Sequence, residues 1–220
     1  MERVRFTREM EATIHRTSSG TGTTDRRGEH PVLVGSRVTV RALHASDAAS
    51  LAVHLTAPEV ARFIAAPPAT VEGFERFIRR KSLQGTDAKT VWFAITLNGT
   101  DSAIGIIQIR ELEPRFQVAE WGFALASAFW GTGVFMEAAS LVLEFAFEQL
   151  GVHRLEARAA VRNGRGGRAL QKVGAVQEGV LRKAFLKDGR YLDQVMYSIV
   201  AEDWRASRET RRMAEPSVIH

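Results

Sequence analysis

A strand-like run, a glycine-bearing turn and a long amphipathic helix follow one another between residues 118 and 150. The turn, residues 130–133, reads W-G-T-G and leads directly into the helix, which Gly151 ends. Glycine lets the backbone approach an anion closely, and the first N–H groups of a helix have no partner within it. The helix dipole adds partial positive charge at the same end. The sequence therefore predicts a phosphate-binding site at the start of this helix.

The remaining pattern predicts strands and helices in a definite order. The expected strands are residues 36–43, 90–97, 102–112, 116–125, 153–161, 176–186 and 191–200. The other expected helices are residues 46–55, 58–64, 71–83 and 165–173. Short turns join the three strands between residues 90 and 125, which favours an antiparallel meander. The sheet is therefore expected to be mostly antiparallel, with one β-α-β crossover in the middle.

Length and composition suggest one medium domain with extensions. Residues 1–31 are polar and rich in glycine, serine and threonine, and we expect a flexible extension there. Residues 32–200 form the predicted domain, and residues 201–220 a helical tail. No apolar run is long enough to span a bilayer and no signal core opens the chain, so we expect a cytoplasmic protein without a membrane partner.

The chain contains no cysteine, which excludes disulfides, thiolate metal sites and a cysteine nucleophile. Its six histidines are scattered without metal-ligand spacing, so no metal is expected. The formal net charge is +5, and residues 151–190 carry ten Lys/Arg against three Asp/Glu. A basic block directly after the glycine turn suits a polyphosphate ligand, although a solvated arginine-rich surface would look the same. A nucleic-acid partner is not expected, because no recognition motif accompanies the charge.

Four patches, taken in order, resemble the GCN5-related N-acetyltransferase (GNAT) superfamily, and within it the group of the ribosomal-protein N-terminal acetyltransferases RimJ and RimL. The patches are A-E-W-G-F-A-L (119–125), W-G-T-G-V-F-M-E-A (130–138), N-G-R-G-G-R-A-L-Q-K-V-G-A (163–175), and E-G-V-L-R (178–182) followed by G-R-Y-L-D-Q-V-M-Y-S (189–198). The resemblance covers roughly residues 34–200. It implies an α+β GNAT fold: a mixed, mostly antiparallel central sheet of about seven strands, helices on both faces, and a central β-α-β crossover.

The resemblance also implies acetyl-CoA as co-substrate and an amine acceptor, either a protein N-terminus or a small-molecule amine. Homodimers are common in such families, and the sequence leaves the oligomeric state open. The implied cofactor-binding residues are Phe123, Ala124, Leu125, Trp130, Gly131, Thr132, Gly133, Val134, Phe135, Asn163, Arg168 and Lys172. Pantetheine would hydrogen-bond along the end of the strand at Phe123 and Leu125, and the amides from Gly131 to Phe135 would hold the pyrophosphate.

Several of these residues have a simpler interpretation as well. Gly131 and Gly133 are also ordinary turn residues, although their matched spacing favours the ligand role. Asn163 would contact the pantetheine arm in the family pattern, but asparagine at this place commonly caps the following helix. Arg168 and Lys172 either face the nucleotide end of the cofactor or lie on a solvated helix face.

Glu120 is the predicted catalytic residue. A carboxylate within an apolar strand is costly unless it is paired or lies in a cleft, so Glu120 either lines the active-site cleft or pairs with an arginine. We favour the cleft, with Glu120 as the base or as the holder of a water that accepts the amine proton.

The chain departs from the family pattern where a general acid would stand. Gly166 replaces the usual serine, Leu170 replaces a tyrosine found in many members, and Phe185 stands where some relatives carry glutamate. Tyr191 and Tyr197 are outside candidates that are expected to pack the hairpin. The departures keep a second hypothesis open, a non-catalytic acyl-CoA-binding protein of the same fold.

Overall fold

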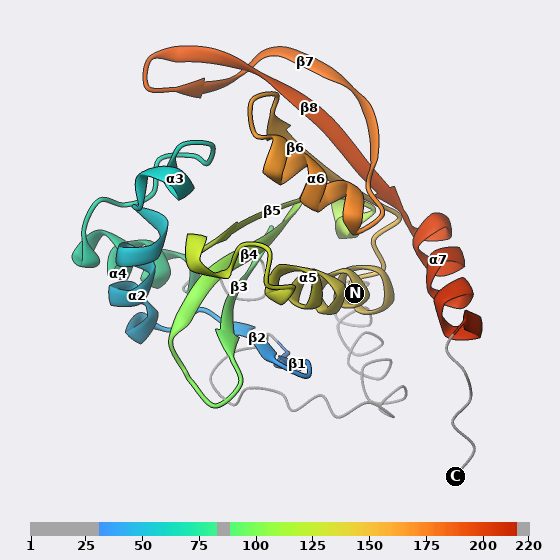
Figure 1. The fold of residues 1–220 in the computed structure, drawn as a ribbon, viewed down its shortest axis with the longest axis horizontal. Helices are drawn as coiled ribbons and strands as arrows, with labels where there is room; N and C mark the ends of the chain where they lie inside the picture. The colour runs from blue at the N-terminus through green and yellow to red at the C-terminus, as the bar shows by residue number, and fades with distance from the viewer. Residues whose placement is uncertain (1–30, 83–88, 215–220) are drawn as a thin grey trace, which may run out of the picture.

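The computed structural model describes residues 31–82 and 89–214, and within them an eight-stranded sheet forms the centre of the molecule (Figure 1). The strand order is β1-β2-β3-β4-β5-β6-β8-β7. The strands are β1 (Leu33–Val34), β2 (Val38–Ala42), β3 (Thr90–Leu97), β4 (Ala103–Glu111), β5 (Val118–Leu125), β6 (Arg154–Ala160), β7 (Val176–Lys187) and β8 (Arg190–Val200). Apart from Pro31, the predicted extension 1–31 lies outside the described residues, as does the end of the tail from residue 215.

Helices cover both faces of the sheet, as predicted. They are α2 (Ala48–Leu55), α3 (Pro58–Ala61), α4 (Val71–Ser82), α5 (Val134–Glu144), α6 (Gly164–Lys172) and α7 (Ala201–Ala214). In Figure 1, α5 and α6 lie across the front of the sheet, α2, α3 and α4 lie at its left, and α7 lies at its right. The predicted long helix is α-helical through Glu144 and continues as a π-helical turn over Phe145–Gln149.

Successive side chains of each strand point to opposite faces of the sheet, and they pack in two separate cores. In β3, Val91, Phe93 and Ile95 pack with residues of α5 and α6, whereas Trp92 and Ala94 pack with α2 and α4. The predicted antiparallel meander is confirmed, because β3, β4 and β5 pair antiparallel in chain order. Strand β2 extends it by pairing antiparallel with β3. The sheet has one strand more than expected, since the two-residue strand β1 adds to β2.

The predicted β-α-β crossover consists of β5, α5 and β6. The two strands pair in parallel over only three positions, from Val118 opposite Arg154 to Glu120 opposite Glu156. Beyond Glu120 they separate, so β5 and β6 leave a gap in the middle of the sheet. The starts of α5 and α6 follow the two separated strand ends.

The closing hairpin turns through Asp188 and Gly189, whose φ angles of 48° and 74° suit a tight two-residue turn. Its second strand, β8, is the inner one and pairs with β6, which leaves β7 at the edge of the sheet. Helix α7 then forms two ion pairs with the end of this long helix, Arg208 with Glu144 of α5 and Arg205 with Glu148 of the π-helical turn.

Candidate active site

The hydrogen bonds at the two ends of β5 show which way its backbone groups point. The N–H of Ala126 donates to the carbonyl of Ile104, and the N–H of Leu112 donates to the carbonyl of Val118. In an antiparallel pair, alternate residues bond to the same neighbour. The even-numbered residues of β5 therefore bond to β4, and the odd-numbered residues direct their backbone groups toward β6.

Three odd-numbered residues of β5, Trp121, Phe123 and Leu125, follow the last position that pairs with β6, and Phe123 and Leu125 lie farthest beyond it. Their backbone groups point into the gap without a strand partner, which is where an extended ligand could add as a short strand. Ala124, between them, has its backbone turned to β4 and its side chain buried in the α2–α4 core. The structure thus brings Phe123 and Leu125, but not Ala124, to the gap.

Trp130 lies at the mouth of this gap. Its indole Nε1 donates to the carbonyl oxygen of Leu125 at 2.9 Å. The guanidinium carbon of Arg165 lies 3.7 Å from the centre of a Trp130 ring, a cation–π contact. Because Trp130 follows β5 and Arg165 belongs to α6, the pair joins the two sides of the gap. Arg165 was not among the predicted site residues, because no motif marks it.

The glycine turn before α5 has the geometry expected of an anion-binding turn. Gly131 and Gly133 have φ angles of 78° and 87°, in the left-handed region that favours glycine. Gly133 is the N-cap of α5, and among the described residues no side chain caps this helix. The N–H of Val134 has only a long contact, 3.5 Å, to the Thr132 hydroxyl. The first amides of α5, including that of Phe135, are thus free of side-chain caps.

Arg37 and Glu137 brace this turn from the β2 side. The Glu137 carboxylate accepts from the Arg37 backbone N–H at 2.9 Å, from Arg37 Nε at 3.0 Å and from the Ser36 hydroxyl at 2.9 Å. Arg37 Nη1 also donates to the Thr132 carbonyl at 3.0 Å. Partial burial alone would raise the pKa of the Glu137 carboxyl, but these donors outweigh it and hold the pKa below its ordinary value. No local pattern in the sequence marks this brace, because its partners lie 100 residues apart.

Asn163 caps helix α6, the simpler of its two predicted roles. Its side-chain oxygen accepts from the N–H of Gly166 at 3.0 Å. Gly167 is buried under Tyr197, whose hydroxyl oxygen lies 2.7 Å from where a Gly167 Cβ would stand. Arg168 and Lys172 are exposed on α6, and Arg168 Nη1 lies near Gly164, 3.3 Å from its would-be Cβ.

Glu120 takes part in an ion-pair network, the second of its two predicted environments. Its Oε2 pairs with Arg110 Nη2 of β4, and its Oε1 lies 3.6 Å from Arg158 Nη1 of β6. Arg158 also lies 3.9 Å from Glu156, the residue opposite Glu120. The Glu120 side chain keeps 16% of its surface exposed, so a path to solvent remains. Its chemical role stays a prediction.

The same network continues to the edge strand. Arg154 Nη1 donates to Glu178 Oε1 of β7 at 2.8 Å, and Glu178 also accepts from the Ser198 hydroxyl at 2.6 Å. The Arg154 guanidinium, followed by that hydroxyl, lowers the pKa of the Glu178 carboxyl to about 2. Charged side chains thus run across one face of β4, β5, β6 and β7.

Comparisons with known proteins decide the family. The family model for the acetyltransferase (GNAT) domain matches residues 37–176. The chain belongs to the GNAT acetyltransferases.

Similar proteins agree with this assignment. An uncharacterized N-acetyltransferase, p20 of Bacillus licheniformis, is 27% identical over 176 residues, covering 78% of this chain and 97% of its own. A solved structure from T. thermophilus, described as a candidate acetyltransferase, is 33% identical with a TM-score of 0.69 and covers 83% of this chain and 96% of its own. Mycobacterium smegmatis RimJ, solved with CoA-disulfide, is 21% identical, with a TM-score of 0.68 and coverage of 80% and 91%, and supports the fold alone.

This acetyltransferase has no acid in the positions where relatives were expected to carry one. Leu170 is buried at 2% exposure. Tyr197 is 5% exposed and packs in the core over Gly167, whereas Tyr191 is 64% exposed near the hairpin turn. Tyr197 is therefore packed, as expected, whereas the expected packing of Tyr191 is wrong because most of its surface is exposed.

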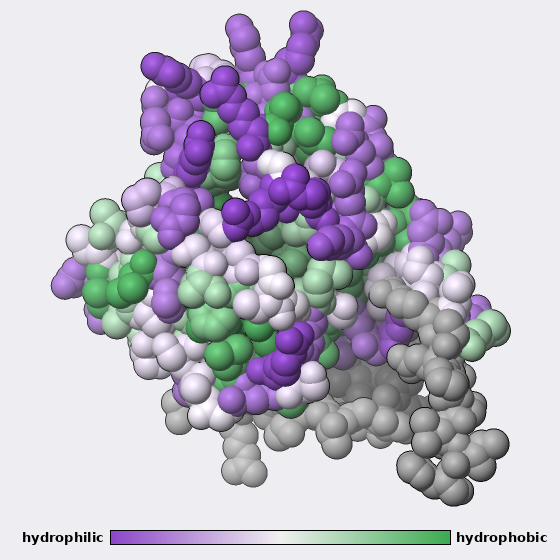
Figure 2. Space-filling view, viewed as in Figure 1, coloured by the Kyte–Doolittle hydropathy of each residue, from purple (hydrophilic) through white to green (hydrophobic). Residues whose placement is uncertain are grey.

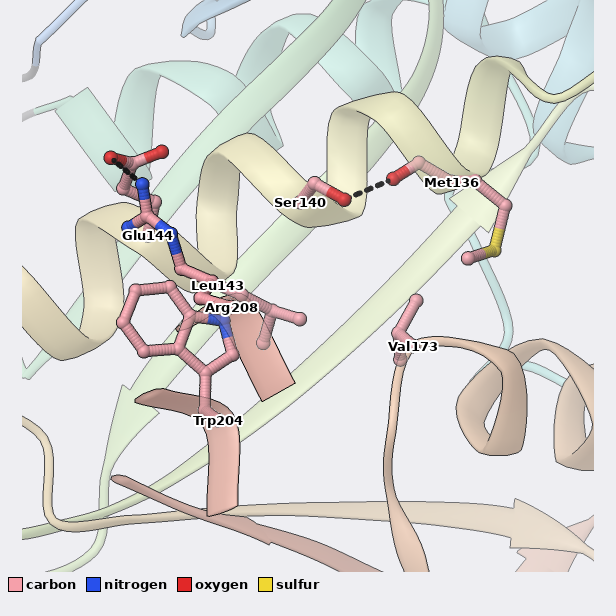
Figure 3. A pocket seen from close by; sticks show the side chains of 7 residues that line it. All are labelled: Met136, Ser140, Leu143, Glu144, Val173, Trp204 and Arg208. Carbon is pink, nitrogen blue, oxygen red and sulfur yellow. Dashed lines mark hydrogen bonds and ion pairs between the residues drawn. The ribbon is translucent and has the colours of Figure 1, made fainter. Parts of the chain in front are cut away.

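A small cavity of about 210 Å³ lies between α5 and α7 (Figure 3). Trp204 and Arg208 of α7, Met136 and Ser140 of α5, and Val173 after α6 line it. Arg208 is held there by its ion pair with Glu144. None of the groups predicted to take part in acyl transfer lies in this cavity.

Hydrophilic side chains crowd the upper part of the face shown in Figure 2, over the β7–β8 hairpin. Within residues 31–82 and 89–214, no group of three or more His, Asp or Glu side chains is arranged to hold a metal ion. No helix in this part of the chain is long and apolar enough to cross a membrane.

Proposed function

We propose that this acetyltransferase moves an acetyl group from acetyl-CoA to a primary amine, by direct attack with both substrates bound. The observation that carries the proposal is the gap between β5 and β6, where the backbones of Phe123 and Leu125 have no strand partner and lie beside an uncapped helix start. These features fit a long cofactor with an extended arm and a diphosphate.

The chain offers a donor or acceptor for each part of such a cofactor. The backbone groups of Phe123 and Leu125 would hold the pantetheine arm, and the amides from Gly131 to Phe135 would hold the diphosphate. The bound cofactor supplies a thioester, which is an activated acyl group. The remaining chemistry falls to the acceptor site around Glu120.

Glu120 would remove or relay the first proton. An alkylammonium has a pKa of about 10, so it must lose a proton before its nitrogen can attack. Glu120, or a water that it holds, accepts that proton. A C–N bond then forms to the acyl carbon and the C–S bond breaks. The nitrogen loses a second proton, and the departing thiolate takes up one from solvent, so one proton is released in total.

The departing thiolate needs little help. A thiol has a pKa of about 8.5, which makes its anion a tolerable leaving group near neutral pH. Glycine at position 166 and leucine at position 170 therefore do not exclude catalysis. They do favour the second candidate function, a protein that binds acyl-CoA without turnover.

Acetyl transfer by the full chain to a panel of amines distinguishes the two functions. The panel contains peptides with free N-termini and small-molecule amines, and CoA release is followed. We expect turnover that Glu120→Gln lowers by about a hundredfold, with unchanged CoA affinity in calorimetry. Glu113→Gln, an exposed carboxylate in the loop before β5, is the matched control. CoA binding without turnover on any amine would select the binding protein instead.

A further inference from the structure

A groove of about 890 Å³ lies along β7, outside the gap between β5 and β6. Its lining consists mostly of consecutive β7 residues, together with one residue each from β6 and β8. The lining residues are Arg158, Val180, Leu181, Arg182, Lys183, Ala184 and Asp193.

An irregularity in the hairpin builds this groove. Leu181 pairs with Gln194 and Phe185 pairs with Leu192, so three residues of β7 stand opposite Asp193 alone. Lys183, in the middle, has a φ of 51°, which is uncommon for a residue other than glycine. Its backbone N–H donates to Asp193 Oδ1 at 2.8 Å. A bulge of this kind redirects side chains, and here it turns consecutive basic residues outward together.

The charge in the groove is strongly positive. Arg158, Arg182 and Lys183 contribute three cations, and Asp193 contributes the single carboxylate. That carboxylate is already engaged by the Lys183 N–H. Arg182 and Lys183 are exposed and form no ion pair with any other described residue. Arg158 also lies within ion-pair distance of Glu120 and Glu156, so Arg182 and Lys183 carry the uncompensated charge that attracts an anion.

Arg158 connects the groove to the predicted catalytic residue. It lines the groove and also approaches Glu120 at 3.6 Å and Glu156 at 3.9 Å. Both distances exceed those of a strong charge-assisted hydrogen bond, about 2.7–2.9 Å. The Arg158 guanidinium is therefore held loosely, and an anion in the groove can share it with Glu120. The groove begins one side chain away from the site of proton transfer.

We propose that the groove selects acceptors that carry a carboxylate or phosphate close to the reacting amine. The inference rests on the proposed function and names its substrate class. The acceptor amine lies at Glu120, and its anionic group lies among Arg158, Arg182 and Lys183. Solvent-exposed cations contribute modest affinity, so the effect is one of preference between acceptors.

Matched acceptors test this directly in the full-length protein. One pair is the peptide Ala-Asp-Glu-Leu against Ala-Asn-Gln-Leu, both amidated at the C-terminus. The other pair is phosphoethanolamine against ethanolamine. A preference within the peptide pair indicates a peptide acceptor, and a preference within the ethanolamine pair indicates a small-molecule acceptor. We expect kcat/KM to be about tenfold higher for the anionic member, and the ratio to decline as salt is raised.

The double variant Arg182→Gln/Lys183→Asn should bring that ratio close to one. Asparagine is chosen at position 183 because it tolerates a positive φ. The control Lys187→Gln/Arg190→Gln removes the same charge from the same hairpin, outside the groove, and should keep the ratio. Equal loss of the ratio in both variants, or equal kcat/KM for both members of each pair in the wild type, overturns the inference. Absence of turnover on every amine overturns the proposed function and the inference with it.

Discussion

Two strand-to-helix turns stand on either side of the gap, and they treat their helix starts differently. The turn after β5 ends in Gly133, which is left-handed and provides no side-chain cap. The turn after β6 ends in Asn163, whose side chain occupies the N–H of Gly166. Both helices have a dipole, but only the first leaves its amides free of a side-chain cap. The capping residue thus decides what a helix start can offer a ligand.

The two turns are also supported differently. The first is braced from a distant strand by Arg37 and Glu137, through charged groups. The second is held by close packing, because Gly167 lies directly against the hydroxyl of Tyr197. The first turn is therefore open toward ligand and held by ionisable groups, whereas the second is closed and held by neutral ones.

The largest effect is expected at Gly133. Alanine there must adopt a left-handed φ, and its Cβ would lie 2.9 Å from Arg37 Nη2. At Gly131 the φ is also positive, but no atom lies within 4 Å of the new Cβ. Both changes cost about 1 kcal/mol in backbone conformation. We expect Gly133→Ala to weaken CoA binding by tenfold or more in calorimetry, and Gly131→Ala by clearly less. Equal losses would show that the brace does not shape the turn.

Removing the charge of the brace should have a smaller effect. Glu137→Gln loses the ion pair to Arg37 but keeps one acceptor oxygen, so we expect about 1 kcal/mol less stability in urea unfolding. Arg37 is 54% exposed, and solvent screening keeps the value this low. Glu144 lies on the same helix as Glu137 and forms an exposed pair with Arg208 of α7; Glu144→Gln breaks that pair and should cost under about 0.5 kcal/mol. If both variants lose a similar amount of stability, the Arg37–Glu137 pair contributes no more than an ordinary surface ion pair.

The second turn is tested by changing its cap. Asn163→Ala should lower the free energy of unfolding by about 1 kcal/mol, whereas Asn163→Ser should retain most of it, because serine caps nearly as well. Calorimetry with CoA then separates capping from a ligand role. If Asn163 only caps, the serine variant binds CoA as the wild type does; a weakened serine variant means that the amide also contacts the cofactor.

Of the two turns, only the first should contribute less to stability at low pH. This is the smallest of the expected effects. The folded pKa of Glu137 lies below its ordinary value of 4.5. Its contribution to stability is therefore complete above the unfolded pKa and is lost as the pH falls from about 4.5 through the lowered value. The stability difference between wild type and Glu137→Gln should shrink over that range in urea unfolding. The difference for Asn163→Ala should stay constant, because an amide does not titrate there.

Sequence predicted best those features that depend on neighbouring residues. The meander, the glycine turn and the two-residue hairpin turn follow from alternation and from glycine, which act locally. The order of β6, β8 and β7 was not predicted, since either strand of a hairpin can face the sheet. Strand β1 was missed because two residues give no period.

Site residues that depend on distant partners could not be predicted in the same way. The Arg37–Glu137 brace, the contact of Arg165 with Trp130 and the bulge at Lys183 all join separate elements. Glu120 illustrates the limit. Its chemistry pointed to either a cleft or an ion pair, but only the register of β4 and β6 brings Arg110 and Arg158 beside it.

The three-position pairing of β5 with β6 has a consequence for self-association. Over its second half, β5 is an edge strand although it lies in the middle of the sheet, and an exposed edge can recruit a strand from another chain. Deuterium should replace the amide protons of Phe123 and Leu125 quickly, while that of Ala124 is protected by β4. The Trp130 indole, which occupies the Leu125 carbonyl, removes one of the few groups with which a foreign strand could begin to pair.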